Sequence, residues 1–331
     1  MGHKVAVMGA TGAVGAEFLS ILENRNFPMD SLRLLASSRS AGKKITFKGE
    51  KLLVEELKHG SFKGIELVLA SAGGSVSREF APSAVKAGAV VVDNTSYFRM
   101  FPDVPLVIPE INPLEIKKHK GIIANPNCST IIMALPLYPL HRAFGVTRVS
   151  VCTYQASSGA GARAMQELRE ETAAVLEGRP YQRTIIPFPY AFNLFLHNSR
   201  YNPETGYCEE ETKMINETRK IFNEPAFRLT AVCVRVPVLR AHSEALNIEF
   251  SREVTPAEAY EALRKAPGVR ILEDPPKNRW PMPSDASGQD PVFVGRIRKD
   301  RSRENTLDLW CVGDQIRKGA ALNAIQIAEL L

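Results

Sequence analysis

One cysteine of this chain stands where a nucleophile is commonly found, between a turn and the start of a predicted helix. Pro126 and Asn127 end a short strand-like run, and an apolar helical series follows Cys128. The N–H groups at a helix N-terminus carry partial positive charge, which favours the thiolate form of a cysteine over the thiol. A small buried apolar residue is the alternative, because free cysteines usually have that role. Position alone therefore leaves both interpretations open.

Two other segments carry polar residues that suit a carbonyl substrate. Gln155 stands at the end of a predicted strand, before a glycine-rich turn, where a neutral amide can orient a bound carbonyl. An ordinary polar loop residue is the alternative. Glu210 and Lys213 are three residues apart at the start of a predicted helix, so their side chains share one face. Most such pairs are surface ion pairs of little energetic value, so these residues are candidates only.

Arg235 and His242 form a third set of candidates. Arg235 lies in an apolar strand, on the face opposite Val232 and Val234. A buried arginine needs an anionic partner or an open cleft, because an unpaired buried charge is costly. His242 follows at a strand turn and differs from the other histidines only by this setting. Those others occur in terminal, lysine-rich or loop contexts and are interpreted as ordinary: His3, His59, His119, His141 and His197.

A glycine-rich run at 9–15, Gly-Ala-Thr-Gly-Ala-Val-Gly, directly follows the first predicted strand and opens a helix. Small residues let the backbone approach a pyrophosphate, whose charge the helix N-terminus binds. A tight strand–helix turn is the alternative, but it needs fewer glycines. The run at 71–74, after another strand, offers a second close approach. The predicted cofactor contacts of these two loops are Gly9, Thr11, Gly12, Ala13, Val14, Ser71, Ala72 and Gly73.

The end of the second predicted strand distinguishes between two cofactors. A free ribose 2′-hydroxyl usually meets an acidic residue about 20 residues beyond the glycines. Residues 37–43, Ser-Ser-Arg-Ser-Ala-Gly-Lys, contain two cations, three hydroxyls and no acid. Arg39 can bind a 2′-phosphate with two hydrogen bonds. The sequence therefore predicts NADP rather than NAD, with contacts from Ser37, Ser38, Arg39 and Ser40.

Composition limits the class of protein. The 331 residues allow two domains, and 44% hydrophobic and 24% charged residues are typical of a soluble globular protein. No apolar run approaches the roughly 20 residues of a membrane span, and a strand begins too early to leave room for a signal peptide. Five cysteines without paired spacing argue against a disulfide or zinc framework. We therefore expect a cytoplasmic protein without a metal site.

The net charge of +6 permits anionic partners. The densest basic run, 296–303, is interrupted by an acidic residue, so we interpret it as a solvated strand end and loop. A nucleic-acid surface needs a broader basic stripe, ideally with aromatic residues between the cations. Small phosphorylated ligands fit the charge balance better.

The pattern of elements predicts an α/β protein of two parts. Up to residue 125, short apolar strands alternate with helices, which favours a doubly wound parallel sheet of the Rossmann type. Beyond 128 we expect an α+β domain with an apparently antiparallel sheet, and 179–207 have no clear period. A terminal helix at 319–331 can return to cover the first part. The predicted domains are 1–127, completed by 314–331, for NADP binding, and 128–313 for catalysis and dimerisation.

With these pieces assembled, the chain closely resembles the aspartate-β-semialdehyde dehydrogenase family, particularly its shorter bacterial branch. The resemblance runs from Val5 to the C-terminus and includes the Gln155 turn, the Glu210/Lys213 helix and the Arg235…His242 segment. The further motifs, in chain order, are GATGAVG at 9–15, SSRSAGK at 37–43, SAGG at 71–74, NTSYFRM at 94–100, VIPEIN at 107–112, PNCST at 126–130, PMPSDASG at 281–288, VFVGRIRK at 292–299 and RKGAALN at 317–323.

The resemblance implies a role for each matching residue. Cys128 would be the nucleophile, His242 the acid/base, and Gln155 the residue that orients the thioester or hemithioacetal. The substrate would be held by Arg99 and Lys213 through phosphate, by Arg235 through the carboxylate, by Glu210 through the amino group, and by Asn127. Ser158, Gly159 and Gln315 would contact the cofactor. The family usually has Asn where Gln315 stands, near the nicotinamide amide, and a glutamine is one methylene longer.

The implied reaction is reversible. Cys128 adds to the semialdehyde, hydride passes to NADP, and phosphate cleaves the thioester to give aspartyl phosphate. The reverse direction serves lysine, threonine and methionine biosynthesis, and the family forms homodimers. N-acetyl-γ-glutamyl-phosphate reductase shares the architecture but typically has a Pro-Gly-Cys-Tyr turn. An inactive NADP-binding paralogue is a second alternative, against which the complete set of catalytic residue types argues.

Overall fold

The computed structural model describes residues 2–331, which form two compact units. One unit comprises the chain up to Asn127 together with Ala320–Leu331, and the other comprises Cys128–Gly319. The sequence-based division also changes at residue 127 but assigns 314–331 to the first unit. The structure has 314–319 in the second unit, because Asp314 and Gln315 bond to groups there.

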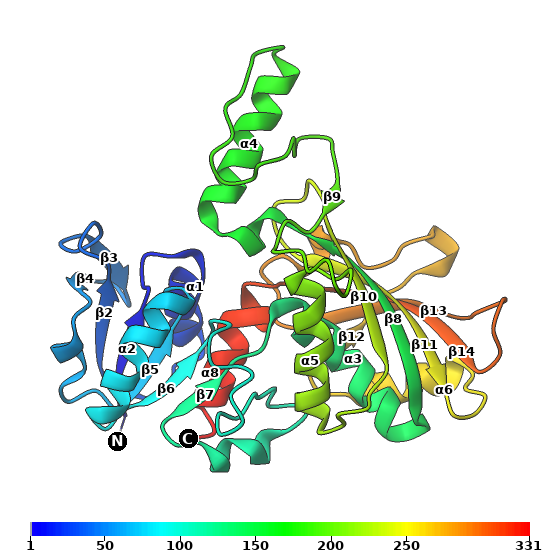
Figure 1. Ribbon diagram of the computed structural model, residues 1–331, viewed down its shortest axis with the longest axis horizontal. Coiled ribbons are helices and arrows are strands. Elements are labelled where there is room, and N and C mark those ends of the chain that lie inside the picture. Colours follow the sequence, from blue (N-terminus) through cyan, green and yellow to red (C-terminus); the bar gives the residue numbers. More distant parts are fainter. Residues whose placement is uncertain (1) are drawn as a thin grey trace. The chain divides into compact units, whose positions relative to one another are not determined.

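The first unit is built on a seven-stranded sheet with the order β3-β4-β2-β1-β5-β6-β7 (Figure 1). All neighbours pair in parallel except β3 and β4, which form an antiparallel hairpin. The predicted doubly wound parallel sheet is therefore confirmed. The strands are β1 (His3–Met8), β2 (Met29–Ala36), β3 (Lys44–Phe47), β4 (Glu50–Glu56), β5 (Leu67–Ala70), β6 (Val90–Asp93) and β7 (Ile122–Ala124).

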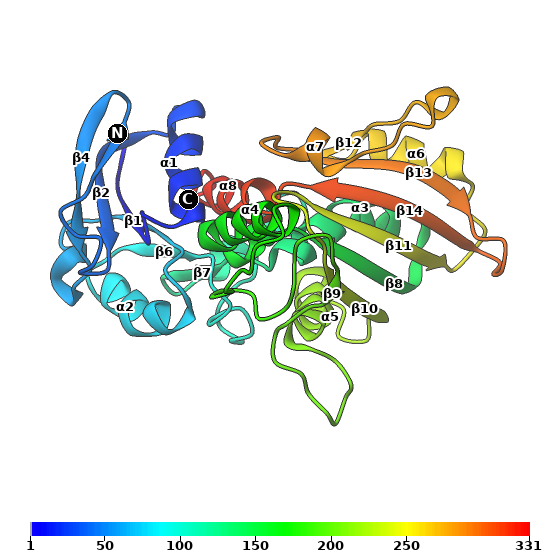
Figure 2. The same ribbon diagram turned by 90° about the horizontal axis from the view of Figure 1, so that it is seen from above.

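Helices complete the core of this unit. Helix α1 packs against α8, and apolar residues of both join the strands in one buried cluster (Figure 2). The predicted terminal helix is shorter than expected, because Arg317–Ala321 form a π-helical turn before α8 begins. The helical segments of the unit are α1 (Ala13–Asn24), α2 (Gly74–Lys86), α8 (Leu322–Ala328) and the 3₁₀ turns η1 (His59–Phe62) and η2 (Pro113–Lys118).

The second unit carries a seven-stranded mixed sheet with the order β12-β13-β14-β11-β8-β10-β9. The expectation of an antiparallel sheet is wrong at two places, because β10 pairs in parallel with β8 and β12 with β13. The strands are β8 (Val146–Gln155), β9 (Phe195–Leu196), β10 (Leu229–Arg235), β11 (His242–Phe250), β12 (Val269–Ile271), β13 (Val292–Lys299) and β14 (Thr306–Gly313).

Helices α3, α5 and α6 pack on one face of this sheet, whereas α4 extends away from it (Figure 1). Strand β10 ends at Arg235, four residues before the predicted end, because Pro237 has no N–H to continue the ladder. The helical segments of the unit are α3 (Cys128–Phe144), α4 (Ala162–Leu176), α5 (Glu209–Phe222), α6 (Pro256–Arg264), α7 (Pro283–Ala286) and the 3₁₀ turns η3 (Ser157–Ala160) and η4 (Pro275–Lys277).

The segment 179–207, which has no sequence period, is organised by two buried carboxylates of α4. Glu167 accepts hydrogen bonds from the N–H groups of three successive residues, 184–186, at 2.6–2.9 Å. Glu171 accepts one from the N–H group of Tyr190 at 3.1 Å. Hydrogen bonds to these carboxylates hold the segment, together with a small apolar cluster that includes Ile186 and Tyr190, without an element long enough to give a readable period.

Candidate functional site

The two glycine loops of the first unit lie side by side, and their close approach leaves no room for side chains at two of the glycines. Gly9 has φ +93°, and a Cβ there would lie 2.5 Å from the carbonyl oxygen of Ser71. A Cβ on Gly15 would lie 2.3 Å from the carbonyl oxygen of Gly9. Within residues 2–331, no side chain caps α1 at Gly12, so the first N–H groups of this helix are available to an anion.

The hydroxyl-rich segment after β2 borders the first loop. The Oγ1 atom of Thr11 lies 3.4 Å from the Oγ of Ser40, and Arg39 is exposed. Ser71 of the second loop accepts a hydrogen bond from the Nδ2 of Asn94 at 3.2 Å. The predicted cofactor contacts of this unit thus gather at the carboxyl ends of β1, β2 and β5, where doubly wound sheets bind dinucleotides.

Arg99 and Asn127, both predicted to bind substrate, are buried residues of the first unit. Arg99 donates from Nε to the carbonyl oxygen of Asn125 at 2.9 Å and from Nη2 to that of Asn94 at 3.0 Å. Two backbone carbonyls therefore hold the guanidinium in one orientation. Such a group suits an anion.

Three predicted site residues meet at one edge of the second sheet. Gln155 and Arg235 are the last residues of the parallel strands β8 and β10, and His242 is the first residue of antiparallel β11. These positions coincide at one end of the sheet. Strand alternation also points the three side chains to the helix-covered face, where each is at most 5% exposed. We call this set, with Glu210 and Gln315, the polar sheet edge.

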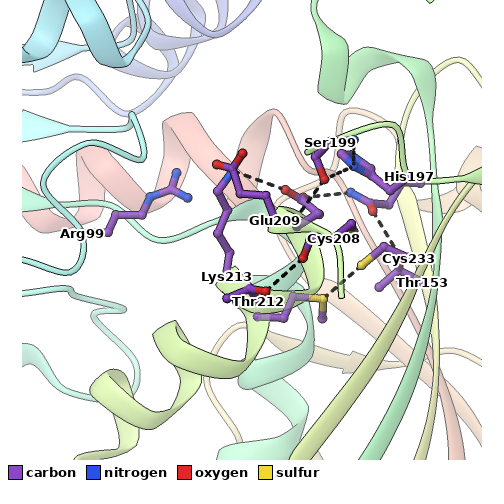
Figure 3. Close-up of polar contacts among 12 residues, drawn as sticks. Arg99, Thr153, His197, Ser199, Cys208, Glu209, Thr212, Lys213 and Cys233 are labelled. Carbon is purple, nitrogen blue, oxygen red and sulfur yellow. Dashed lines mark hydrogen bonds and ion pairs between the residues drawn. The ribbon is translucent and has the colours of Figure 1, made fainter. Parts of the chain in front are cut away.

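Glu210 joins this edge from the first turn of α5. Its Oε1 accepts a hydrogen bond from the Nε2 of Gln155 at 3.2 Å, and its Oε2 lies 3.8 Å from the Nζ of Lys213. Lys213 also pairs with Glu209 at 2.8 Å (Figure 3). The buried carboxylate at Glu210 therefore differs from an ordinary surface pair, because it is oriented by a buried amide.

His242 is completely buried, and its hydrogen bonds define its tautomer. Nδ1 accepts from the N–H of Ala156 at 3.0 Å, so the neutral ring carries its proton on Nε2. Among residues 2–331, Nε2 has no hydrogen-bond partner. Burial, reinforced by the charge of Arg235, lowers the pKa of His242 to about 3. The ring is thus a neutral donor whose one N–H is unused.

Gly159 leaves the space in front of this N–H open. A Cβ on Gly159 would lie 3.2 Å from both the Nε2 of His242 and the Nη1 of Arg235. Its φ is not positive, so the requirement for glycine here comes from space rather than backbone conformation. The predicted cofactor contact at Gly159 therefore lies against both side chains.

Cys128 is the first residue of α3, as the sequence predicts. Gly319 packs on it so closely that a Cβ there would lie 3.0 Å from the Cβ of Cys128 and 3.3 Å from that of Gln315. The Oε1 of Gln315 accepts from the N–H of Ala241 at 2.9 Å, and its Nε2 donates to the Oγ of Ser158. Both groups of the Gln315 amide are therefore engaged by the protein.

Asp314 anchors the turn that carries Gln315. It is fully buried, pairs with Arg240 at 2.6 Å and accepts the N–H of Gly288 at 2.6 Å. Its second oxygen accepts the N–H groups of the two residues after Gln315. The turn at Gln315 is thus held by an ion pair between buried Asp314 and half-buried Arg240 that the sequence did not predict.

Within the second unit the structure brings together most of the predicted residues, and it adds one that was interpreted as ordinary. His197 is that residue: its Nε2 lies 2.8 Å from the Nη2 of Arg235. The interpretation of His197 as an ordinary loop histidine is wrong, because a two-residue strand, β9, places it beside β10. No period in the surrounding residues signals this strand.

The fold and the site define a two-domain oxidoreductase of the Rossmann type. Family models agree: "Semialdehyde dehydrogenase, NAD binding domain" matches residues 4–119, and "Semialdehyde dehydrogenase, dimerisation domain" matches 137–318. The chain therefore belongs to the semialdehyde dehydrogenase family.

Similar proteins are aspartate-semialdehyde dehydrogenases. The relative from Synechocystis is 59% identical over 99% of this chain and 97% of its own length, and that from Aquifex aeolicus is 53% identical over 100% and 98%. Among solved structures, aspartate semialdehyde dehydrogenase II from Vibrio cholerae complexed with ASA has a TM-score of 0.97, 42% identity and coverage of 100% and 98%. The Candida albicans enzyme with NADP has a TM-score of 0.76, 27% identity and coverage of 100% and 98%.

Within residues 2–331, no helix combines the length and apolar character needed to cross a membrane.

Proposed function

We propose that this chain catalyses the reversible, NADP-dependent conversion of L-4-aspartyl phosphate to L-aspartate 4-semialdehyde and phosphate. The observation that carries the proposal is the pair of opposite buried charges at the polar sheet edge. Arg235 suits an α-carboxylate and Glu210 suits an α-amino group. Gln155 and His242 lie at the same edge and suit a carbonyl oxygen.

Cys128 supplies the nucleophile, and its place at the start of α3 stabilises the thiolate. In the oxidising direction, the thiolate sulfur forms a bond to the aldehyde carbon, and the negative charge moves to the aldehyde oxygen. The unused Nε2–H of His242 donates a hydrogen bond to that oxygen. Base catalysis by this ring would require an unprotonated Nε2, so the hydrogen bond from Ala156 favours the donor role.

The final step of this direction needs phosphate. Arg99 of the first unit and Lys213 of the second each carry a positive charge suited to it, and a phosphate oxygen forms a bond to the thioester carbon. The carbon–sulfur bond breaks, and the electron pair returns to the sulfur of Cys128 as thiolate. The reverse sequence, from the acyl phosphate, supplies the semialdehyde for lysine, threonine and methionine biosynthesis.

The glycine loops of the first unit fit NADP. The backbone at Gly9 comes so close to Ser71 that a side chain there would fill the space, and the N-terminus of α1 suits the pyrophosphate. Arg39 would hold the 2′-phosphate, as the absence of acid from residues 37–43 favours. When bound, the cofactor would supply the hydride acceptor for oxidation of the aldehyde and the hydride donor for the reverse reaction.

The function is tested by following NADPH absorbance with two aldehydes, each with and without phosphate. We expect reduction of NADP only with aspartate semialdehyde and phosphate together. Reduction with N-acetylglutamate semialdehyde instead would assign the chain to the related N-acetyl-γ-glutamyl-phosphate reductase reaction. No reduction with either aldehyde, from protein that binds NADP, would indicate an inactive paralogue.

We further propose that the protein is a homodimer formed through the open face of the second sheet. This face, opposite α3 and α5, is lined by apolar and aromatic side chains between cations, and Val232 on it is 47% exposed. The residues used here are Cys152, Val232, Asn247, Trp280, Arg296 and Trp310. The match to a dimerisation domain over 137–318 supports the proposal.

Light scattering during gel filtration tests the dimer. Val232→Asp introduces a charge into the proposed interface and is expected to shift the protein from twice the chain mass to one chain mass. An unchanged mass for this variant would contradict the interface.

We also place the protein in the cytoplasm, because its five cysteines are thiols.

A further inference from the structure

His197 lies beside the polar sheet edge because of an otherwise unremarkable two-residue strand. In β9, Phe195 pairs with Arg235 in antiparallel register, and the N–H of His197 donates to the carbonyl oxygen of Cys233 at 2.8 Å. The strand therefore fixes the backbone of His197 against the end of β10.

The two ring nitrogens of His197 have different partners. Nε2 lies 2.8 Å from the Nη2 of Arg235, and a guanidinium can only donate, so Nε2 accepts. Nδ1 lies 3.0 Å from the Oγ of Ser199 and 3.2 Å from the backbone nitrogen of the same residue, so it contacts Ser199 twice. Burial, opposed by Glu210 and reinforced by Arg235 and Lys213, lowers the pKa of His197 to about 4. The neutral form is thus retained at ordinary pH.

Ser199 connects the ring to the start of α5. Its Oγ accepts a hydrogen bond from the backbone N–H of Glu210 at 3.1 Å. A continuous set of hydrogen bonds therefore runs from Arg235 through His197 and Ser199 to Glu210. Its two ends are the cation and the anion proposed to bind the two charged groups of an α-amino acid.

We propose that His197 is a positioning residue that orients Arg235 relative to Glu210 and thereby determines specificity for an aldehyde with an α-amino acid group. The proposal rests on the function proposed above. The second nitrogen of the Arg235 fork, Nη1, donates to the carbonyl of Ala156 at 3.1 Å, so His197 supplies the other restraint on the guanidinium. Nε of Arg235 has no partner among residues 2–331 and can serve the substrate carboxylate.

The test compares three variants with aspartate semialdehyde and two shortened aldehydes. 3-Aminopropanal lacks the carboxylate, and succinic semialdehyde lacks the amino group. For His197→Phe we expect the KM for aspartate semialdehyde to rise about tenfold or more, as loss of a hydrogen bond to a charged group predicts. We expect kcat to change by less than about threefold and the KM for NADP to stay unchanged.

Two conservative variants distinguish the contribution of the Nε2 contact with Arg235 from that of the Nδ1 contact with Ser199. His197→Gln places an amide near the Nε2 position and is expected to recover most of the KM, because it can still accept from Arg235. His197→Asn places it near Nδ1 and is expected to remain impaired. His59→Gln, a change at an exposed histidine in η1, is the matched control.

The decisive measurement is the preference for aspartate semialdehyde over 3-aminopropanal, expressed as a ratio of kcat/KM. The proposal predicts that His197→Phe reduces this ratio about tenfold while leaving kcat/KM for 3-aminopropanal nearly unchanged. An equal loss on all three aldehydes would indicate a merely structural role and overturn the proposal, as would an unchanged ratio. Wild-type activity toward aspartate semialdehyde, measured in the same series, tests the proposed function separately.

Discussion

The glycine loops of the first unit and the polar sheet edge of the second are suited to bind ligands through different groups. The loops present backbone: Gly9 and Gly15 exclude side chains so that N–H groups can approach a ligand. The sheet edge presents buried side chains, and His242 and Gln155 are each oriented by another group of the protein. A backbone site tolerates an exposed periphery, whereas a buried side-chain site depends on every partner.

This difference predicts that changes in the second unit act on the aldehyde reaction, through kcat or through the KM for the aldehyde, whereas changes at the loops act on the KM for NADP. The largest expected effect is that of Cys128→Ala. Removal of the nucleophile should lower kcat by about four orders of magnitude or more, as for other covalent catalysts. The assay is NADP reduction with aspartate semialdehyde and phosphate. Undiminished activity would contradict the thioester mechanism, and equal NADP affinity in variant and wild type would confirm that the loops are intact.

Gly159→Ala tests the crowding of the sheet edge without removing a functional group. The new Cβ would lie 3.2 Å from both His242 and Arg235, which must then shift by a few tenths of an ångström. We expect kcat/KM for the aldehyde to fall about 10–100-fold, since catalysis is sensitive to small displacements. Gly60→Ala, at a glycine with open space around it, is the control and should be neutral. Equal behaviour of the two variants would remove the argument from space.

Arg39→Glu tests the cofactor loops. A negative charge beside the 2′-phosphate should raise the KM for NADP about tenfold or more, while the KM for the aldehyde changes little. The two constants are measured in one series of initial rates. Equal increases in both would contradict the assignment of Arg39 to the 2′-phosphate. Arg39→Gln, which removes charge without reversing it, should lie between wild type and Arg39→Glu.

The smallest effect expected is on stability in acid. His242 and His197 have pKa values of about 3 and 4 in the folded protein, below the value near 6.5 expected when unfolded. Between pH 6.5 and 4 the unfolded chain therefore binds protons that the folded protein does not. The free energy of unfolding consequently decreases as the pH is lowered through this range. Each histidine should contribute about 1–2 kcal/mol of this loss between pH 7 and 5.

Urea denaturation of wild type and His197→Phe at pH 7 and 5 measures one of these contributions. The variant should lose about 1–2 kcal/mol less than wild type between the two pH values. Burial raises the pKa of Asp93 and Glu244, and these two carboxyl groups stabilise the folded protein as the pH is lowered. The contribution of His197 is therefore taken from the difference between wild type and His197→Phe, in which the effects of the carboxyl groups cancel. An identical pH dependence in both proteins would contradict the buried neutral state of His197.

Much of the fold was predictable because its signals are local. The glycine run follows β1 directly, and Pro126 and Asn127 end a strand immediately before α3. The mixed character of the second sheet was not predictable, since the direction of β10 against β8 depends on a connection of 73 residues, from 156 to 228. The same connection hides β9 and therefore His197.

The sequence by itself determined the residue types available for chemistry and the backbone loops suited to a dinucleotide. A helix start at Cys128, a glycine loop and a basic, acid-free segment are written in neighbouring residues. Only the tertiary structure decided which nitrogen of His242 carries the proton and which side chain restrains Arg235. Those outcomes depend on hydrogen bonds between residues that are 86 and 38 positions apart, and such contacts exist only once the sheet has formed.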